Sequence, residues 1–268
     1  MKNINIKNVE NVSLFDLGIE LNQVVANCSK SEVYQDINKL VDGIECEFSQ
    51  IKTIKNKLDF LLKQFYIEWG FQGDYEEFYS SKNALLVNVL NRRKGIPVTL
   101  GVIFLYIGNL LGLNLKPICF PTQFILSIKL EDKSTLYLNP FDGQYLDKKT
   151  LQSWITGLKN PFMKLNQTHL EEAKNSDVLM KWIAVLKSTF LREERYLDAL
   201  KFINIALTLE PEDAFEVRDR GYIYQQLDCN SMAINDYNFF IEKYPEDPAS
   251  ELLKVQIKAL NDNKVVIH

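Results

Sequence analysis

Histidine is scarce in this sequence, and its cysteines are scattered. The histidines are His169 and His268, and the thiols belong to Cys28, Cys46, Cys119 and Cys229. A tetrahedral zinc site needs closely spaced ligands of these types, and no C-x-x-C pair occurs. The start, "MKNINIKNVENVSLFDLG", has no apolar signal segment. We therefore expect no metal and a reduced, cytoplasmic protein.

Signatures of nucleotide and nucleic-acid binding are also missing. No G-x-x-x-x-G-K-[ST] or strand-linked G-x-G-x-x-G occurs, so no nucleotide cofactor is expected. The net charge is -4, and the only basic run, at residues 92–94, is typical of a solvated helix end. Neutralising phosphates takes clustered lysine and arginine, so neither a nucleic-acid partner nor direct DNA contact is expected.

A membrane span is disfavoured, although residues 95–115 carry no charge. Their length suits a bilayer. Pro97 and four glycines interrupt the run, however, and a helix that is apolar on all sides is also typical of a buried core. We expect a buried helix of a globular protein, with no membrane partner.

The bulk composition suits a globular chain of two domains. Its 268 residues are 46% hydrophobic and 25% charged, as is usual for soluble proteins. Helical spacing of apolar residues over 12–66 predicts several amphipathic helices. The segment "KNALLVNVLNRR" predicts another, which Gly95 would cap, and Pro97 and Gly112 would start and end the next.

From residue 123 the period changes to two. Phe124, Leu126 and Ile128 alternate with their neighbours, which predicts a half-buried strand. The turn "EDKS" and the segment "TLYLN" complete an antiparallel hairpin. If the leucine faces match, Gln123, Tyr137 and Asn139 share the opposite face. Gly101, Gly108 and Gly112 would let the preceding helix pack closely on a sheet.

Beyond residue 170 a 34-residue period appears. Pairs with this spacing are Phe190 and Tyr224, Ala199 and Ala233, and Pro211 and Pro245. This period and these residue types indicate tetratricopeptide repeats, although Lys187 stands where the first repeat should have the glycine found at 221. Asp247 and Pro248 would begin a final helix. We place one domain at 1–168 and the repeats at 169–268.

Together, "GFQGD", "NVLNRRKGIPVTL", "PTQF", "LNPFDG" and the repeat tail resemble the bacterial SirB family of transglutaminase-like proteins, named for an association with an invasion regulator. The resemblance runs from about Phe65 to the C-terminus. It implies an α+β, mainly α fold: a helix packed on an antiparallel sheet, then a small helical repeat tail. In that fold, the face that carries Gln123, Tyr137 and Asn139 would look toward the start of the glycine-rich helix.

The resemblance also implies where catalytic groups would stand. The superfamily's cysteine would fall near 97–99, its histidine at Gln123 and its aspartate at Asn139, so Thr99, Gln123 and Asn139 form a degenerate triad. Changing only the orienting Asp to Asn in a serine protease costs about 10⁴ in rate, and neither amide titrates near neutral pH. Conventional triad catalysis is not expected.

Other nucleophiles remain to be weighed. Cys119 or Thr99 would be the fallback of a weak cysteine-type hydrolase or acyltransferase. A lone cysteine is more often a small buried residue, and a threonine at a helix start is usually structural. His169 stands in a polar stretch typical of an interdomain linker or a surface segment, and Asp142 suits an Asp-Gly turn.

The favoured hypothesis is a protein-interaction or regulatory protein that affects gene expression indirectly, with the weak enzyme as the alternative. By resemblance to tetratricopeptide proteins, the first helix of each repeat lines a concave surface that would bind an acidic or C-terminal carboxylate group of a protein or peptide partner. The competing interpretation is that the residues expected to line this surface are ordinary exposed residues with no binding role. These residues are Lys181, Ser188, Arg192, Arg218, Tyr222 and Gln225.

Overall fold

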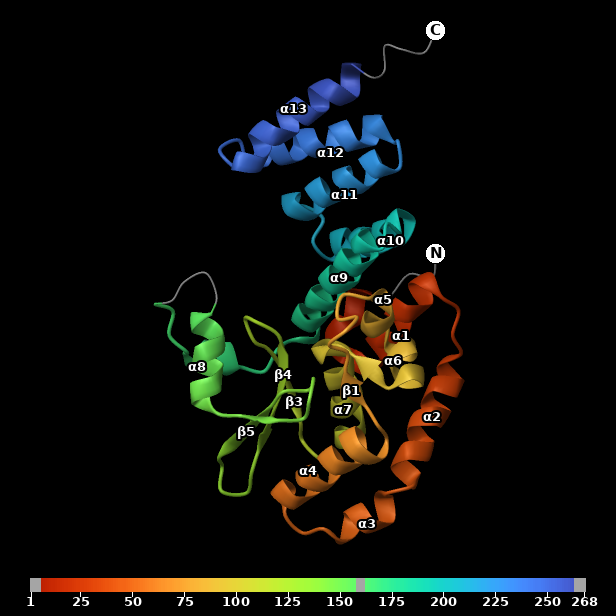
Figure 1. Ribbon diagram of the computed structural model, residues 1–268, viewed down its shortest axis with the longest axis vertical. Helices are drawn as coiled ribbons and strands as arrows, with labels where there is room; N and C mark the ends of the chain where they lie inside the picture. The colour runs from red at the N-terminus through yellow and green to blue at the C-terminus, as the bar shows by residue number, and fades with distance from the viewer. Residues whose placement is uncertain (1–5, 158–161, 263–268) are drawn as a thin grey trace. The chain divides into compact units, whose positions relative to one another are not determined.

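The computed structural model describes residues 6–157 and 162–262 (Figure 1). The chain divides into two compact units, Met1–Trp182 and Ile183–His268. The division falls within α9 (Asn175–Arg192), whereas the sequence-based boundary at residue 168 stands before that helix and stays a prediction.

The first unit begins with short helices whose starts are capped by side chains. After the 3-10 turn η1 (Ile6–Asn11), the oxygens of Ser13, Ser29 and Thr53 accept hydrogen bonds from the first-turn N–H groups of three helices. Such caps satisfy donors that a helix start leaves unpaired. The helices predicted for residues 12–66 are confirmed. They are α1 (Leu14–Val25), α2 (Lys30–Asp42), α3 (Glu45–Gln50) and α4 (Ile54–Lys63), which continues into η2 (Gln64–Glu68).

The central helix of the first unit is α7 (Pro97–Leu110), and it follows α5 (Ser81–Ala84) and α6 (Leu86–Arg92). Its predicted start at Pro97 is confirmed, as is its end, because Gly112 adopts φ +82°. Gly95 does not cap the preceding helix: Arg93 does, with φ 61°. Gly95 instead belongs to β2 (Lys94–Gly95), paired with β1 (Gln72–Gly73), where a Cβ would come within 2.9 Å of the Thr99 hydroxyl.

The predicted hairpin is confirmed and lies in a four-stranded antiparallel sheet of order β3–β4–β5–β6. Leu126 pairs with Leu138 and Ile128 with Leu136, so the leucine faces match. The strands are β3 (Lys116–Cys119), β4 (Phe124–Lys129), β5 (Thr135–Leu138) and β6 (Tyr145–Leu146).

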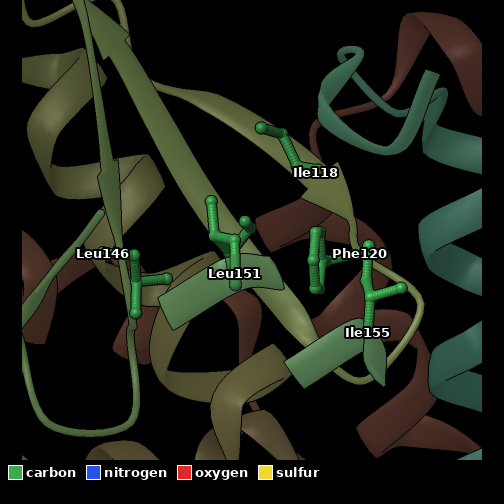
Figure 2. Packing of buried hydrophobic residues seen from close by; sticks show 6 residues of the cluster. Ile118, Phe120, Leu146, Leu151 and Ile155 are labelled. Carbon is green, nitrogen blue, oxygen red and sulfur yellow. The ribbon is translucent and has the colours of Figure 1, made fainter. Parts of the chain in front are cut away.

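The expectation that β4 is half-buried is wrong, because helices cover both of its faces. On one face the ring of Phe124 packs where Gly101 of α7 leaves room. On the other, Ile125 joins the buried cluster of Figure 2 with residues of α8 (Lys148–Thr156). Tyr137 packs against the same cluster, so its face of the sheet meets α8. The expectation that this face looks toward α7 is therefore wrong.

Of the three glycines expected to line α7 against a sheet, only Gly101 has a strand residue, Phe124, as its near neighbour. A Cβ on Gly108 would meet Leu115 and Leu61, which are outside the sheet. A Cβ on Gly112 would meet nothing within 4 Å. The close approach of helix to sheet is therefore local to Gly101.

The second unit is helical, as the 34-residue period predicts. Gly221 packs against Tyr237, because a Cβ there would come within 2.8 Å of the tyrosine ring. The N–H of Ala249 donates to the Asp247 carboxylate at 2.8 Å, which confirms the capped final helix. After α9, the helices are α10 (Tyr196–Leu209), α11 (Ala214–Gln226), α12 (Asn230–Lys243) and α13 (Pro248–Asp262).

Candidate functional site

The two amides that the family resemblance places at the positions of the catalytic base and its orienting acid contact each other. Gln123 precedes β4 and Asn139 follows β5, so the hairpin register brings them together. The Gln123 Nε2 donates to the Asn139 Oδ1 at 3.1 Å. The same Oδ1 accepts from the N–H of Phe141 at 3.2 Å, and Asn139 is 8% exposed. Because amides do not titrate near neutral pH, this pair holds the turn but offers no general base.

Thr99 is buried at the start of α7. Its hydroxyl donates to the Asn83 carbonyl at 2.8 Å and accepts from the Ile96 N–H at 3.2 Å. These partners are backbone groups, and none is an imidazole or a carboxylate. The residue therefore ties α7 to α5, and none of its hydrogen-bond partners in the described part of the chain is a base that would activate it.

Cys119 stands at the end of β3 between Ile118 and Phe120. Figure 2 shows those two neighbours in the cluster under α8, so the intervening thiol points to the opposite face of the strand. His169 of η3 (Gln167–Leu170) packs against the Phe120 ring, on the α8 side. Burial raises the pKa of the Cys119 thiol, although the Lys181 ammonium acts in the other direction. The imidazole is therefore in contact with Phe120, whereas the thiol faces away from the cluster to which Phe120 belongs.

A buried polar cluster that the sequence analysis missed joins β1, α5 and α6. The Asn83 side chain donates to the Asp74 carboxylate at 3.1 Å and accepts from Arg92 at 2.8 Å. Burial favours the neutral form of Asp74, but bonds from the Glu77 N–H and Asn83, with Lys94 and Arg92 nearby, outweigh it and lower its pKa. The only sequence signal is a polar residue every nine positions, which matches no helical or strand period.

The six residues assigned to a concave surface are not equivalent. Lys181 belongs to the first unit and donates to the backbone carbonyls of Cys119 and Phe120. The Gln225 oxygen accepts from Tyr237 and Gln256, so this side chain joins three helices.

The remaining four residues stand on α9 and α11. Ser188, Arg192 and Tyr222 are exposed. Arg218 is half-buried, pairs with Asp219 at 2.8 Å and lies over the rings of Phe215 and Phe240. The two helices are neighbours, because Lys187 of α9 makes ion pairs with Glu216 and Asp219 of α11. Lys187 stands at the position where the repeat pattern has a glycine, and its side chain makes the ion pairs that a glycine could not make.

Within the described residues, no three histidine, cysteine or acidic side chains gather as metal ligands would. None of the helices in that part of the chain combines the length and apolar character needed to cross a bilayer.

Comparison with known proteins agrees with this architecture. The family model of the transglutaminase-like superfamily matches residues 31–184, and a tetratricopeptide-repeat model matches 186–258. A Vibrio cholerae relative, "UPF0162 protein", is 43% identical over the whole length of both chains. "Protein SirB1" of Salmonella typhimurium is 40% identical and "UPF0162 protein YchA" of Escherichia coli 37%, each over 88% of both chains. No solved structure gives a significant match. The chain belongs to the transglutaminase-like superfamily and, within it, to the family of SirB1 and the UPF0162 proteins.

Proposed function

We propose that this chain is a non-catalytic member of its superfamily that binds a protein or peptide and influences gene expression indirectly. The observation that carries the proposal is the hydrogen bond between Gln123 and Asn139. The resemblance assigns these two positions to a base and the carboxylate that orients it, and the amides found there are bonded to each other and to the backbone of the turn. Removing a base or nucleophile from such a mechanism costs more than about 10⁴ in rate.

The repeat tail supplies the binding surface in this proposal, since tetratricopeptide repeats generally mediate protein interactions. Arg192 follows Ser188 by one helical turn on α9, and Tyr222 follows Arg218 by one turn on α11. The ion pairs of Lys187 hold these helices side by side. A guanidinium beside an exposed phenol suits the carboxylate of an acidic or C-terminal peptide group. Lys181 and Gln225 are left out, because their polar groups already serve the fold.

Affinity capture with the immobilised full chain, from extracts of its native cell, tests this surface. The variant Tyr222→Ala combined with Arg192→Ala should lose the partner that the unchanged chain retains. Met232→Ala, on the exposed side of the second helix of its repeat, is the matched control and should retain it. Equal recovery by all three proteins would refute the assignment. Arg218 is kept in place, because its stacking on Phe215 and Phe240 also stabilises the fold.

A weak cysteine-type hydrolase or acyltransferase is the alternative, and the Lys181 ammonium near Cys119 is the observation in its favour. A cation lowers a thiol's pKa. Burial is the larger effect here and leaves the pKa of Cys119 raised, so the reactive thiolate is scarce at neutral pH. The non-catalytic proposal is the better supported of the two.

A further inference from the structure

The first unit exposes three aromatic side chains within five residues. Tyr75 is 75% exposed, Tyr79 59% and Phe78 37%, in the loop between β1 and α5. Single exposed aromatics are ordinary, but a contiguous group of them marks an interaction surface. The loop is far in sequence from the repeat tail, so it is a separate candidate for binding.

A buried ring, Phe141, packs against two of these side chains, and the third, Tyr79, contacts Phe78. Phe141 is 8% exposed, and its ring centroid lies 4.6 Å from that of Tyr75 and 5.8 Å from that of Phe78. Phe141 packs on Gly73, where an added Cβ would come within 2.4 Å of its ring. The N–H of Phe141 also donates to Asn139, which connects this aromatic group to the amide pair. Side chains held in advance lose less entropy when they bind a partner.

The same loop carries an excess of negative charge. Glu76 and Glu77 are exposed between the aromatic residues. Arg92, which pairs with acids of this loop, donates to Asn83 at 2.8 Å and to Asp74 at 3.3 Å, while its distance to the Glu77 carboxylate is 3.9 Å. Arg92 thus mainly neutralises the buried Asp74. Aromatic faces and carboxylates together attract cations, whereas a neutral partner would gain nothing from the two acids.

We propose that Tyr75, Glu76, Glu77, Phe78, Tyr79 and Phe141 form an aromatic–acidic patch that binds lysine or arginine side chains of a basic protein segment. The aromatic rings contact the aliphatic stem and the cationic group, and the carboxylates neutralise the charge. The patch is distinct from the repeat surface, and neither proposal depends on the other. A neutral proline-rich segment, which aromatic grooves also bind, is the competing occupant.

Fluorescence anisotropy of the full chain with short labelled peptides tests the proposal. Lysine–glycine and arginine–glycine peptides should bind, with an affinity that falls as salt is added, and serine–glycine, glutamate–glycine and proline-rich peptides should not. Tyr75→Ala should weaken binding about threefold, because an exposed cation–π contact contributes about 0.5–1 kcal/mol. Tyr75→Phe keeps the ring and should bind as the unchanged chain does.

Two further variants test whether the negative charge contributes to binding and whether binding occurs at this loop or at the repeat tail. Glu76→Lys reverses an exposed charge, and combined with Tyr75→Ala it should weaken binding of the basic peptides at least about tenfold. Tyr222→Ala, in the repeat tail, should leave their affinity unchanged. The proposal is overturned if the basic peptides do not bind, or if the proline-rich peptide binds with the same affinity as they do. It is also overturned if Tyr222→Ala weakens binding of the basic peptides as much as Tyr75→Ala does. Thermal unfolding of each variant confirms that affinity is compared between folded proteins.

Discussion

At the scale of single residues, Asn139 explains why the amide pair stabilises the fold. Its Oδ1 is the acceptor for both Gln123 and the buried N–H of Phe141. We expect Asn139→Ala to lower the free energy of unfolding by about 1–3 kcal/mol, the cost of a buried donor left unpaired. Gln123→Ala should cost less, because the Phe141 N–H keeps its acceptor. Urea unfolding compares the two variants, and equal losses would contradict this role for Asn139.

Single residues also show where sequence reasoning succeeds and fails. The meeting of Gln123 and Asn139 follows from the two-residue period, which fixes the register of a hairpin once its leucine faces match. The cluster of Asp74, Asn83 and Arg92 is not predictable in this way, because its members stand on three short elements with no shared period. Gly95 resembles a helix cap in the sequence because it is a glycine that follows a helix. In the structure, its missing side chain leaves room for the hydroxyl of Thr99.

At the scale of elements, the contact of α7 with β4 depends on Gly101. A Cβ there would lie 2.5 Å from the ring of Phe124, which is itself buried. We expect Gly101→Ala to lower the free energy of unfolding by about 1–3 kcal/mol, as overpacking does. Gly157→Ala is the control, since its nearest contact would be 3.5 Å away. Thermal or urea unfolding that finds Gly101→Ala as stable as the control would contradict the close packing.

The contact of α9 with α11 depends on Lys187, which is 8% exposed and pairs with Glu216 at 2.7 Å and Asp219 at 2.8 Å. Lys187→Met leaves Glu216 without its cation, while Asp219 keeps its pair with Arg218 at 2.8 Å. Because the Glu216 carboxylate is then partly buried and uncompensated, we expect a loss of about 3 kcal/mol in urea unfolding. Lys243→Met breaks an exposed pair with Glu212 and should cost under about 1 kcal/mol. Equal losses from both substitutions would show that the burial of Lys187 contributes nothing.

The pH dependence of this contact has a definite sign. Burial opposes the charge of Lys187, but Asp219 and Glu216 outweigh it and raise the pKa above its ordinary value. The stabilisation is therefore complete below the unfolded pKa of about 10.4 and is lost only as the pH rises through the higher folded pKa. Unfolding of the unchanged chain and of Lys187→Met should differ equally at pH 7 and pH 9 and converge at more alkaline pH. A difference that vanished by pH 8 would contradict the raised pKa.

The order of elements was largely predictable and the faces they cover were not. Periods of 3.6 and 2, with their capping residues and prolines, are local properties of the chain. Burial of the second face of β4 comes from α8, which begins nineteen residues after β4 ends, and no local pattern reports it. The contact of Lys181 with the carbonyls of Cys119 and Phe120 is equally invisible to a local pattern, because these residues lie about sixty positions earlier in the sequence.

At the scale of the whole molecule, a transglutaminase-like unit and a repeat unit share one chain. In our proposal this combination binds a partner, because the resemblance places amides where a catalytic base and its orienting acid would stand. The alternative, a cysteine-type hydrolase or acyltransferase, requires one thiol that is more reactive than the others. Cys46 and Cys229 are exposed and serve as internal references, while Cys119 is half-buried with a raised pKa. Reactivity of all the thiols can be compared in the intact protein.

The most direct measurement is the rate of alkylation by iodoacetamide at each cysteine of the full chain, followed by mass spectrometry from pH 6 to pH 10. The account predicts that Cys119 reacts more slowly than Cys46 and Cys229 at pH 7, and that its rate is still rising with pH above about 9. It also predicts that no thiol exceeds the rate of free cysteine. Alkylation of Cys119 faster than free cysteine at pH 7, with its rate sustained down to pH 6, would contradict the central claim.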